Sequence, residues 1–149
     1  MLLGELLLSK GLLTRAQLEE ALEEQKSTRE FLGEILLRKK FIREDNFLML
    51  LSKQFNIPYV RLRDQSIDWD SAMRFPASLI MDHRCLPLRF ENGRWIVAIT
   101  NPLDAETVSE AERAANSERV DLVLVTSGDM EDALKEYQKR VADKIKKMF

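Results

Sequence analysis

The stretch LLGELLLSKGLL, residues 2–13, recurs as FLGEILLRKKFI at residues 31–42, an offset of 29 positions (31 − 2). At this offset, residues 2–25 align with residues 31–54 and share eight identical pairs. The pairs are Leu3/Leu32, Gly4/Gly33, Glu5/Glu34, Leu7/Leu36, Leu8/Leu37, Lys10/Lys39, Leu22/Leu51 and Gln25/Gln54. The sequence therefore contains an internal repeat, which predicts two copies of one small structural unit.

Apolar residues in each repeat follow helical spacing, and turn signals divide the two repeats into four short helices. Gly11 ends the first helix, because glycine accepts the left-handed conformation at a helix C-terminus. Thr14 and Gln17 have the spacing of a capping box, and Leu13 can pack on Leu18 beside it, so the second helix begins at Thr14. Each hairpin is too small to bury its own apolar face, so the two are expected to share a core. The expected core stripes are Leu3, Leu6 and Leu7; Leu18, Ala21, Leu22 and Gln25; Leu32, Ile35 and Leu36; and Phe47, Leu50 and Leu51.

After residue 56 the pattern favours strands. IPYVRL, residues 57–62, alternates like a strand, and residues 71–84 indicate a short helix interrupted or ended near Pro76. In CLPLRFENGRWIVAIT, residues 85–100, Asn92-Gly93 suits a type I′ turn and predicts a β-hairpin. The pairs expected across this hairpin are Phe90/Trp95, Leu88/Val97 and Leu86/Ile99.

The remaining sequence predicts a helix from Asp104 to about Ala115, a strand at residues 119–125 and a terminal helix capped by Thr126 or Ser127. The apolar stripe of the terminal helix is Met130, Leu134, Tyr137, Val141 and Ile145. The predicted fold class is α+β, with an N-terminal pair of helical hairpins packed on a small C-terminal β-α-β-β-α-β-α unit. The corresponding domains are residues 1–56 and 57–149.

The composition excludes several functional classes. The chain has 149 residues, 45% of them apolar, and a formal net charge of −2, which gives no electrostatic field for general nucleic-acid binding. The longest apolar runs, residues 47–51 and 95–99, are far shorter than the roughly 20 residues that span a bilayer. The N-terminal leucines lack the basic lead of a secretory signal. A single cysteine, Cys85, forms no internal disulfide. These features predict a cytoplasmic protein without a transmembrane segment.

The sequence shows no catalytic or metal-binding constellation. None of its five glycines belongs to a Gly-x4-Gly-Lys-Ser/Thr loop, so we expect no nucleotide hydrolysis by this chain. One histidine and one cysteine cannot form a zinc site, so His83 is expected to make an ordinary hydrogen bond and Cys85 to fill a core position. The chain is predicted to be non-enzymatic, with no cofactor and no metal. We interpret the four glutamates Glu19, Glu20, Glu23 and Glu24 as the solvated face of a helix.

Two stretches leave alternatives open. The basic end KIKKMF, residues 144–149, suits an anionic membrane or an acidic partner, or else is a solvated helix end. Trp69, Met73 and Phe75 lie in a short segment interrupted by proline, where they form either a protein-binding surface or ordinary core.

Each repeat has Leu-Gly, followed by Leu or Phe, Leu and Gln at fixed helical intervals, and the first repeat has a second glycine seven residues after Gly4. These residues are Leu3-Gly4, Gly11, Leu18, Leu22 and Gln25, then Leu32-Gly33, Phe47, Leu51 and Gln54. The pattern resembles the N-terminal domain of the type II secretion and type IV pilus assembly ATPases, such as general secretory pathway protein E. The resemblance continues through QFNIPYVRL and HRCLPLRFENGRWIVAITNPLD and covers nearly the whole chain.

The resemblance implies a domain that lies ahead of a motor ATPase and connects it to the inner-membrane platform or to regulators. The expected function is therefore a non-enzymatic adaptor, and the expected partner is the platform protein or the cognate motor ATPase domain. One branch of this family binds cyclic di-GMP on the two tandem motifs, so a cyclic di-GMP receptor is the alternative. The ligand-binding residues implied for that alternative are Leu3, Gly4, Leu7, Gly11, Leu18, Leu22, Gln25, Leu32, Gly33, Leu36, Phe47, Leu51 and Gln54.

This chain departs from the cyclic di-GMP-binding branch at three positions. That branch opens each motif with Arg-Leu-Gly, whereas this chain has Leu2 and Phe31 at the arginine positions. The second motif also has Lys40 where the first has Gly11. Without the arginines, the chain lacks charge-assisted contacts worth roughly 1.5–3 kcal/mol each. The cations close enough in sequence to compensate are Arg29, Lys40, Arg43, Arg61 and Arg63; otherwise the repeat is retained for its packing.

Overall fold

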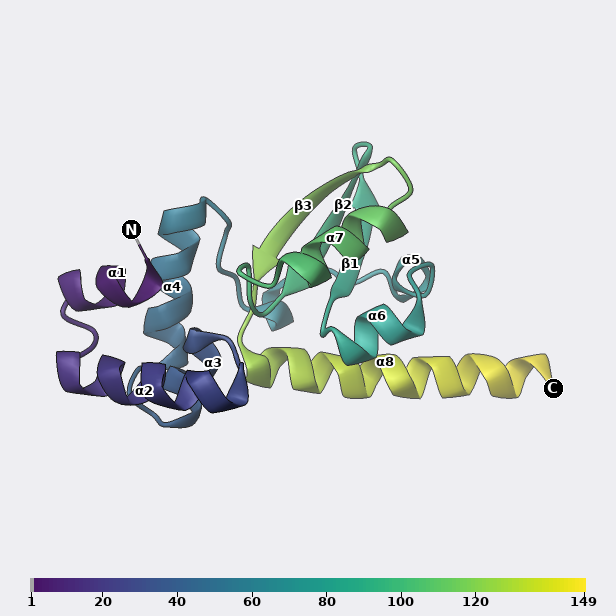
Figure 1. Ribbon diagram of the computed structural model, residues 1–149. Helices are drawn as coiled ribbons and strands as arrows, with labels where there is room; N and C mark the ends of the chain where they lie inside the picture. Colours follow the sequence, from purple (N-terminus) through teal and green to yellow (C-terminus); the bar gives the residue numbers. More distant parts are fainter. Residues whose placement is uncertain (1) are drawn as a thin grey trace. The chain divides into compact units, whose positions relative to one another are not determined.

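The structure is a computed structural model that describes residues 2–149 (Figure 1). It divides into two compact units, one ending at Phe47 and the other comprising Leu48–Phe149. Helix α4, Glu44–Phe55, contains this division. The division after residue 56 that the sequence pattern suggested stays a prediction. The α+β class is confirmed, because helices precede a small three-stranded mixed sheet with helices of its own.

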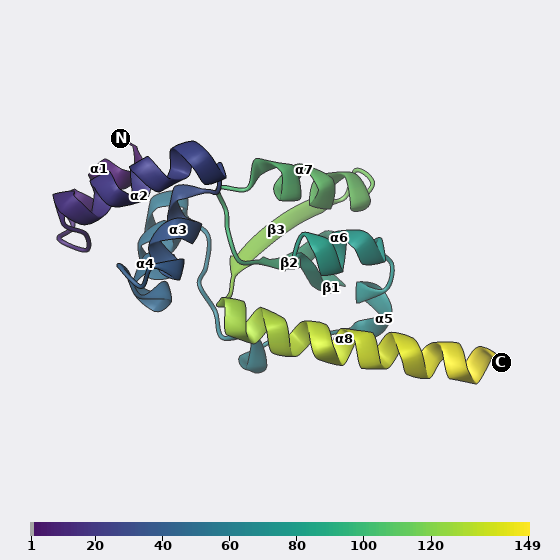
Figure 2. The same cartoon turned by 60° about the horizontal axis from the view of Figure 1, so that its bottom comes forward.

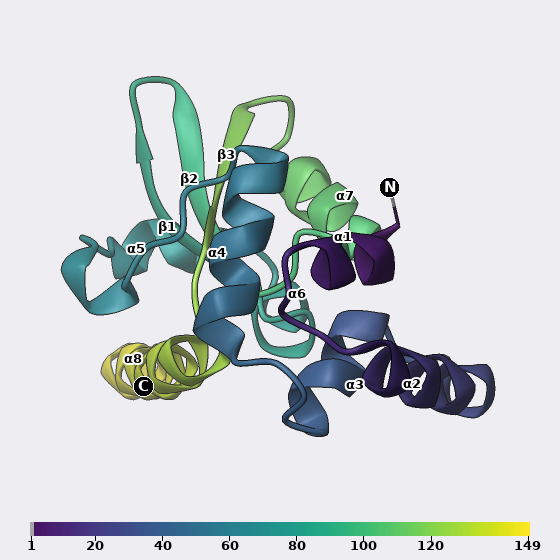
Figure 3. The same ribbon diagram turned by 90° about the vertical axis from the view of Figure 1, so that its left-hand side faces the viewer.

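The four predicted N-terminal helices are confirmed, and α2 and α3 contact each other (Figure 3). The helices are α1, Leu3–Ser9; α2, Arg15–Thr28; α3, Leu32–Arg38; and α4, Glu44–Phe55. The capping box of α2 is also confirmed. The backbone N–H of Gln17 donates to Thr14 Oγ1 at 3.2 Å, and the backbone N–H of Thr14 donates to Gln17 Oε1 at 3.1 Å.

The buried face of α2 is narrower than the predicted stripe. Leu18 and Ala21 are buried, but Leu22 is 40% exposed, so its assignment to the core is wrong. At 3.6 residues per turn, Leu22 lies about 40° to one side of Leu18 while Ala21 lies about 60° to the other side. The buried direction falls between Leu18 and Ala21, which leaves Leu22 at the edge. Gln25 is half-buried, and its side-chain amide donates to the backbone carbonyl of Glu30 at 3.0 Å.

The second unit contains a mixed sheet in the order β1-β2-β3 (Figures 1 and 2). β1 and β2 are antiparallel, whereas β2 and β3 are parallel and connected through α7, which contacts α6. The strands are β1, Leu86–Glu91; β2, Arg94–Ile99; and β3, Arg119–Leu124. The helices are η1, a 3₁₀ turn at Leu62–Asp64; α5, Trp69–Ala72; α6, Ala77–Asp82; α7, Ala105–Ala114; and α8, Ser127–Met148.

The strand predicted at residues 57–62 is wrong, because this segment forms only an isolated bridge between Tyr59 and Leu124. The N–H of Leu124 donates to Pro58 O at 2.7 Å, and the N–H of Val60 donates to Leu124 O at 2.9 Å. Pro58 has no N–H to extend the ladder. At Leu62 the chain enters the 3₁₀ turn η1, so the bridge does not lengthen into a fourth strand.

The predicted turn of the β-hairpin is confirmed, but the predicted residue pairs farther from the turn are not. Asn92 and Gly93 have φ of 52° and 76°, as a type I′ turn requires, and Phe90 pairs with Trp95. The other two predicted pairs are wrong, because Leu86 lies opposite Ala98 and Pro87 opposite Val97, with a register shift between Pro87 and Arg89. The extra residue is Leu88, whose carbonyl accepts the N–H of Asp68 at 2.7 Å.

The helix starts in the second unit follow their predicted caps. The backbone N–H of Thr107 donates to Asp104 Oδ1 at 3.2 Å at the start of α7. Of the two residues proposed to cap α8, it is Thr126 that accepts the N–H of Asp129, at 3.1 Å.

The apolar stripe of α8 is buried along only part of the helix. Met130, Leu134 and Tyr137 are buried, but Ile145 is 52% exposed. The exposure of Ile145 differs from the predicted stripe because the last turns of α8 extend beyond the other elements of the second unit (Figures 1 and 2). Within residues 2–149, no helix combines the length and apolar character needed to cross a membrane.

The different burial of two repeat-equivalent leucines gives a stability prediction. Leu51 has no exposed surface, whereas Leu22 is 40% exposed. We expect Leu51→Ala to lower the free energy of unfolding by about 2–5 kcal/mol, as a buried truncation does. Leu22→Ala should lower it by about 0.5–1 kcal/mol, because little new cavity forms at a surface position. Denaturant unfolding followed by circular dichroism measures both, and equal losses would contradict the assignment of Leu22 to the surface.

Candidate functional site

The two Leu-Gly motifs occupy equivalent places in the first unit. A Cβ on Gly4 of α1 would lie 2.7 Å from Leu18 Cδ1 of α2, and a Cβ on Gly33 of α3 would lie 2.6 Å from Phe47 Cζ of α4. Real Cβ atoms do not come so close, so glycine is needed for these side chains to reach the helix backbone. Leu18 and Phe47 are separated by the repeat offset. The predicted equivalence of the two hairpins is therefore confirmed.

The turns after α1 and α3 also share one backbone conformation. Gly11 has φ of 69° and Lys40 has φ of 60°, both in the left-handed region. In each turn the N–H of the next residue donates to a carbonyl five residues earlier, at 3.1 Å after Gly11 and 2.9 Å after Lys40. A residue with a side chain is disfavoured in this region. The exchange of glycine for lysine in the second repeat thus leaves the turn intact at some cost in backbone strain.

The residues implied as ligand-binding differ widely in exposure. Eleven belong to the first unit, and Leu51 and Gln54 belong to the second. The buried members are Gly4, Leu7, Leu18, Gly33, Leu36, Phe47 and Leu51. The half-buried members are Leu3, Gln25 and Leu32, and the exposed members are Gly11, Leu22 and Gln54. More than half of the motif residues therefore form core, and only the others are accessible to a ligand.

The positions just before the two motifs carry exposed apolar side chains. Leu2 is 79% exposed and Phe31 is 41% exposed. Both are N-cap residues with extended backbone, at φ −68° and ψ 153° for Leu2 and φ −62° and ψ 141° for Phe31. Their side chains supply no charge for an anionic ligand. They do supply apolar surface of the kind found in protein interfaces.

An ion-pair network that the repeat pattern did not predict joins α2 to α3. Arg38 Nη2 lies 2.5 Å from Glu24 Oε2 and 2.8 Å from Glu30 Oε1, and Lys39 Nζ lies 3.6 Å from carboxylate oxygens of Glu20 and Glu24. The hydrogen bond from Arg38 lowers the pKa of Glu24. Glu19, Glu20 and Glu23 are exposed, in agreement with the solvated face predicted for them, whereas Glu24 is half-buried and paired with cations of α3 and its C-terminus. The sequence does contain a signal for this network. It is the run of glutamates in the second predicted helix together with the adjacent cations Arg38 and Lys39 at the end of the third.

Some cations that could replace the missing arginines already have partners. Arg43 pairs with Asp45 at 2.9 Å, and Arg61 pairs with Asp64 at 3.1 Å. Within residues 2–149, the candidate cations that form no ion pair are Arg29, Lys40 and Arg63. Of these, only Arg29 and Lys40 belong to the first unit, so an anionic ligand bound there would find at most two of these candidates without an ion pair.

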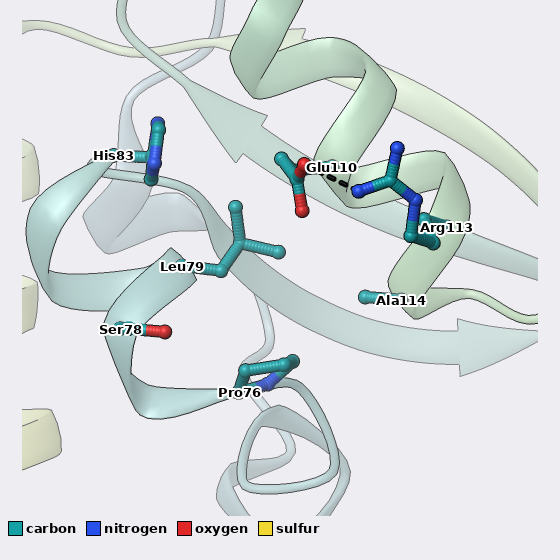
Figure 4. Close-up of a pocket in the computed structure, with 7 residues that line it drawn as sticks. All are labelled: Pro76, Ser78, Leu79, His83, Glu110, Arg113 and Ala114. Carbon is teal, nitrogen blue, oxygen red and sulfur yellow. Dashed lines mark hydrogen bonds and ion pairs between the residues drawn. The ribbon is translucent and has the colours of Figure 1, made fainter.

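A pocket of about 310 Å³ lies between α6 and α7 in the second unit (Figure 4). Leu79 and His83 line it from α6 and its C-terminus, and Glu110 and Arg113 line it from α7. Arg113 Nη1 is paired with Glu110 Oε1 at 2.5 Å. The pocket therefore combines an apolar floor with an ion pair and one imidazole.

His83 belongs to a hydrogen-bonded chain that connects α6 to α7. Thr107 is buried, and its hydroxyl donates to Asp104 Oδ2 at 2.8 Å, while His83 Nδ1 lies 3.1 Å from Thr107 Oγ1. A threonine hydroxyl has one proton, so the proton of the His83 contact must come from Nδ1. In the neutral ring, Nε2 is then the free acceptor. The expectation of an ordinary hydrogen bond for His83 is confirmed.

The segment containing Trp69, Met73 and Phe75 divides between core and surface. Phe75 is buried, and its ring centroid lies 4.9 Å from that of Trp95, so a surface role for Phe75 is wrong. Trp69 and Met73 are half-buried. Cys85 is buried as expected, and burial raises the pKa of its thiol to about 12, so it remains a neutral core residue. No group of three or more His, Cys, Asp or Glu side chains within residues 2–149 is placed to hold a metal ion.

Comparison with known proteins identifies related domains. The MshEN domain family model matches residues 55–143. The type IV pilus assembly ATPase PilB of Thermus thermophilus is 34% identical over 109 residues, which is 72% of this chain and 12% of that protein. PilB of Myxococcus xanthus is 26% identical over 135 residues, which is 91% of this chain and 24% of that protein. The chain therefore spans less than a third of either ATPase.

Solved structures share the same architecture. A structure of MshE with cyclic di-GMP is similar to this chain at a TM-score of 0.80 and 26% identity, covering 92% of this chain and 99% of that one. The N-terminal domain of XpsE is similar at a TM-score of 0.74 and 15% identity, covering 88% of this chain and 90% of that one. At that identity the XpsE domain shows the shared fold alone.

The two glycine contacts predict unequal effects of adding a methyl group. We expect Gly33→Ala to lower the free energy of unfolding by about 1–3 kcal/mol, because the rigid ring of Phe47 must move as a whole. Gly4→Ala should cost less than about 1 kcal/mol, because the flexible end of Leu18 can rotate and alanine gains about 1 kcal/mol of helix propensity.

Denaturant unfolding of the two variants measures this difference. Gly128→Ala is a matched control, because a Cβ at this position in the first turn of α8 would meet no atom within 4 Å. We expect the control to be neutral or slightly stabilising. A larger loss for Gly4→Ala than for Gly33→Ala would contradict the packing described for the two motifs.

Proposed function

The chain belongs to the MshEN domain family, the N-terminal domains of type IV pilus and type II secretion ATPases, and we propose that it acts as a non-enzymatic adaptor domain. In this role it binds a component of the pilus or secretion machinery, either the inner-membrane platform protein or the cognate motor ATPase domain. It would work at the cytoplasmic side of the inner membrane through such partners. The observation that carries this proposal is the exposed apolar pair Leu2 and Phe31.

Three exposed apolar side chains of the first unit support protein binding. Leu2 and Phe31 occupy equivalent repeat positions, and Leu22 is a third large apolar side chain exposed on this unit. Large apolar side chains left in water have a free-energy cost that contact with a partner removes. A small anionic ligand would gain little from the same side chains.

Substitution of the apolar pair tests the adaptor role. Leu2→Gln/Phe31→Gln should weaken capture of the platform protein's cytoplasmic segment or of the motor domain by about tenfold or more, because apolar interface centres carry most of the binding energy. The melting temperature should change by no more than a few degrees, because both side chains are exposed. Surface plasmon resonance and thermal denaturation measure the two quantities.

Met49→Gln is the matched control for this test. Met49 is 51% exposed on α4 and lies outside the proposed pair, so the control should bind within about twofold of the parent chain. Undiminished capture by the double variant, or an equal loss in the control, would contradict a docking role for Leu2 and Phe31.

A cyclic di-GMP receptor is a second candidate function, supported by the likeness to MshE with cyclic di-GMP over 92% of this chain. The ligand would contact the accessible residues of the two Leu-Gly motifs. Against this role, Leu2 and Phe31 stand at the positions where the receptor branch resembled by this sequence has arginines. Two missing charge-assisted contacts correspond to about 3–6 kcal/mol of binding free energy. A loss of that size is large enough to raise a micromolar dissociation constant above the physiological concentration range of the ligand.

Calorimetric titration with cyclic di-GMP separates the two functions. We expect no binding heat and no melting shift with the unmodified chain at about 100 µM ligand, and measurable binding by Leu2→Arg/Phe31→Arg, because the substitutions supply the two cations. Leu2→Lys/Phe31→Lys is a control for charge without the guanidinium geometry. Micromolar binding by the unmodified chain, lost in a folded Gly33→Leu variant, would favour the receptor over the adaptor.

A further inference from the structure

The second unit contains a groove between α5 and α8, here named the α5–α8 groove, with a volume of about 420 Å³. Figure 2 shows the two helices between which it lies. Its apolar side is formed by Trp69 and Met73, both half-buried. Four cations of α8, Lys139, Arg140, Lys144 and Lys147, line it as well, and so do three carboxylates, Asp70, Glu136 and Asp143. The groove lies entirely within Leu48–Phe149 and includes none of the Leu-Gly motif residues.

The aromatic ring that lines the groove stacks with a neighbouring cation. The Arg140 guanidinium lies 5.6 Å from the centroid of the Trp69 ring, and its Nε donates to Glu136 Oε1 at 2.8 Å. This hydrogen bond lowers the pKa of Glu136, so the carboxylate stays ionised beside Arg140. Arg140 therefore balances the negative charge of Glu136. The Trp69 side chain is half-buried, so part of its surface stays accessible.

The lysines of the groove form no ion pair among residues 2–149, although Asp70 and Asp143 line the same groove. These lysines are Lys139, Lys144 and Lys147. Arg140, Lys144 and Lys147 are spaced four and three residues apart, so they share one face of α8. Over residues 135–149, the helix carries six Lys or Arg residues and two Asp or Glu residues. This excess of positive charge contrasts with the net charge of −2 for the whole chain.

We propose that the α5–α8 groove docks an acidic segment of a partner protein that also carries an apolar side chain. Carboxylates of the segment would pair with Lys139, Lys144 and Lys147, and the apolar side chain would pack on Trp69 and Met73. The excess of positive charge over residues 135–149 identifies the acidic character of the partner, and the half-buried side chains of Trp69 and Met73 identify its apolar anchor. A lipid surface is the alternative occupant that the vesicle experiment below tests.

This inference goes beyond the adaptor role assigned to the first unit, because it concerns a second docking surface made of different residues. Loss of binding at Leu2 and Phe31 would leave the α5–α8 groove unchanged, and the reverse also holds. The two proposals can therefore fail separately. A domain with both surfaces would be able to contact two protein segments.

A synthetic peptide of twelve residues, with glutamates on both sides of a central phenylalanine, tests the groove in the full chain. We expect saturable binding by fluorescence anisotropy of the labelled peptide, and a shift in tryptophan emission, because Trp69 is half-buried while Trp95 is buried. Affinity should fall steeply as sodium chloride rises from about 0.05 M to 0.5 M, because salt screens exposed charges. The same peptide with lysine in place of glutamate should not bind.

Charge reversal locates the binding surface. Lys139→Glu/Lys144→Glu/Lys147→Glu should weaken peptide binding at least tenfold, with an unchanged circular dichroism spectrum. The matched control, Lys10→Glu/Lys40→Glu/Lys53→Glu, changes the net charge equally at exposed positions elsewhere and should bind within twofold of the parent.

Several results would overturn the proposal. These are no peptide binding by the parent chain, equal weakening in both triple variants, and equal binding of the lysine peptide. Binding to vesicles containing about 30% phosphatidylserine without peptide binding would assign the groove to a membrane instead. Self-association in sedimentation that the groove variant abolishes, without peptide binding by the parent, would assign it to a second copy of this chain.

Discussion

The packing of a large side chain directly on a glycine backbone, Leu18 on Gly4 and Phe47 on Gly33, is the contact on which the first unit depends. α1 and α3 have seven residues each and no side-chain hydrogen bond at their N-caps. Helices of this length are unstable alone, so tertiary contact must hold them. The missing Cβ lets the facing helix approach closely enough to supply that contact.

The second unit depends on backbone groups that find partners outside the regular ladder. The bulged residue Leu88 gives its carbonyl to the N–H of Asp68, at the start of α5. The carboxylate of Asp129, in the first turn of α8, accepts the N–H of Leu62 at 3.0 Å. These two bonds attach the irregular segment between them to the sheet and to α8. The position of α5 relative to α8, and therefore the groove between them, follows from this attachment.

The docking surfaces that we propose for the two units are made of exposed and half-buried side chains. In the first unit the accessible features are apolar, while the ion pairs of Arg38 neutralise charges between α2 and α3. In the second unit, Lys139, Lys144 and Lys147 form no ion pair within residues 2–149, and they line a groove together with the half-buried Trp69 and with Asp70 and Asp143. The hydrogen bonds that connect His83, Thr107 and Asp104 join α6 to α7 and leave one ring nitrogen of His83 free, so we assign them a structural role. The exposed apolar side chains of the first unit and the groove of the second are the surfaces for which we propose contact with partner proteins.

The sequence by itself determined the features that depend on neighbouring residues or on the repeat: the helix caps, the hairpin turn, the four N-terminal helices and the equivalence of Gly4 and Gly33. A cap or a turn needs only residues a few positions apart, and a repeat is visible as identity at a fixed offset. Tertiary structure alone decided the exposure of Leu22, the bulge at Leu88 and the short bridge in place of a first strand. It also decided the candidate docking surfaces, because Trp69 and the α8 lysines are about 70 residues apart in sequence. Periodicity shows which face of an element is apolar, but the elements that pack against it decide how much of that face is buried.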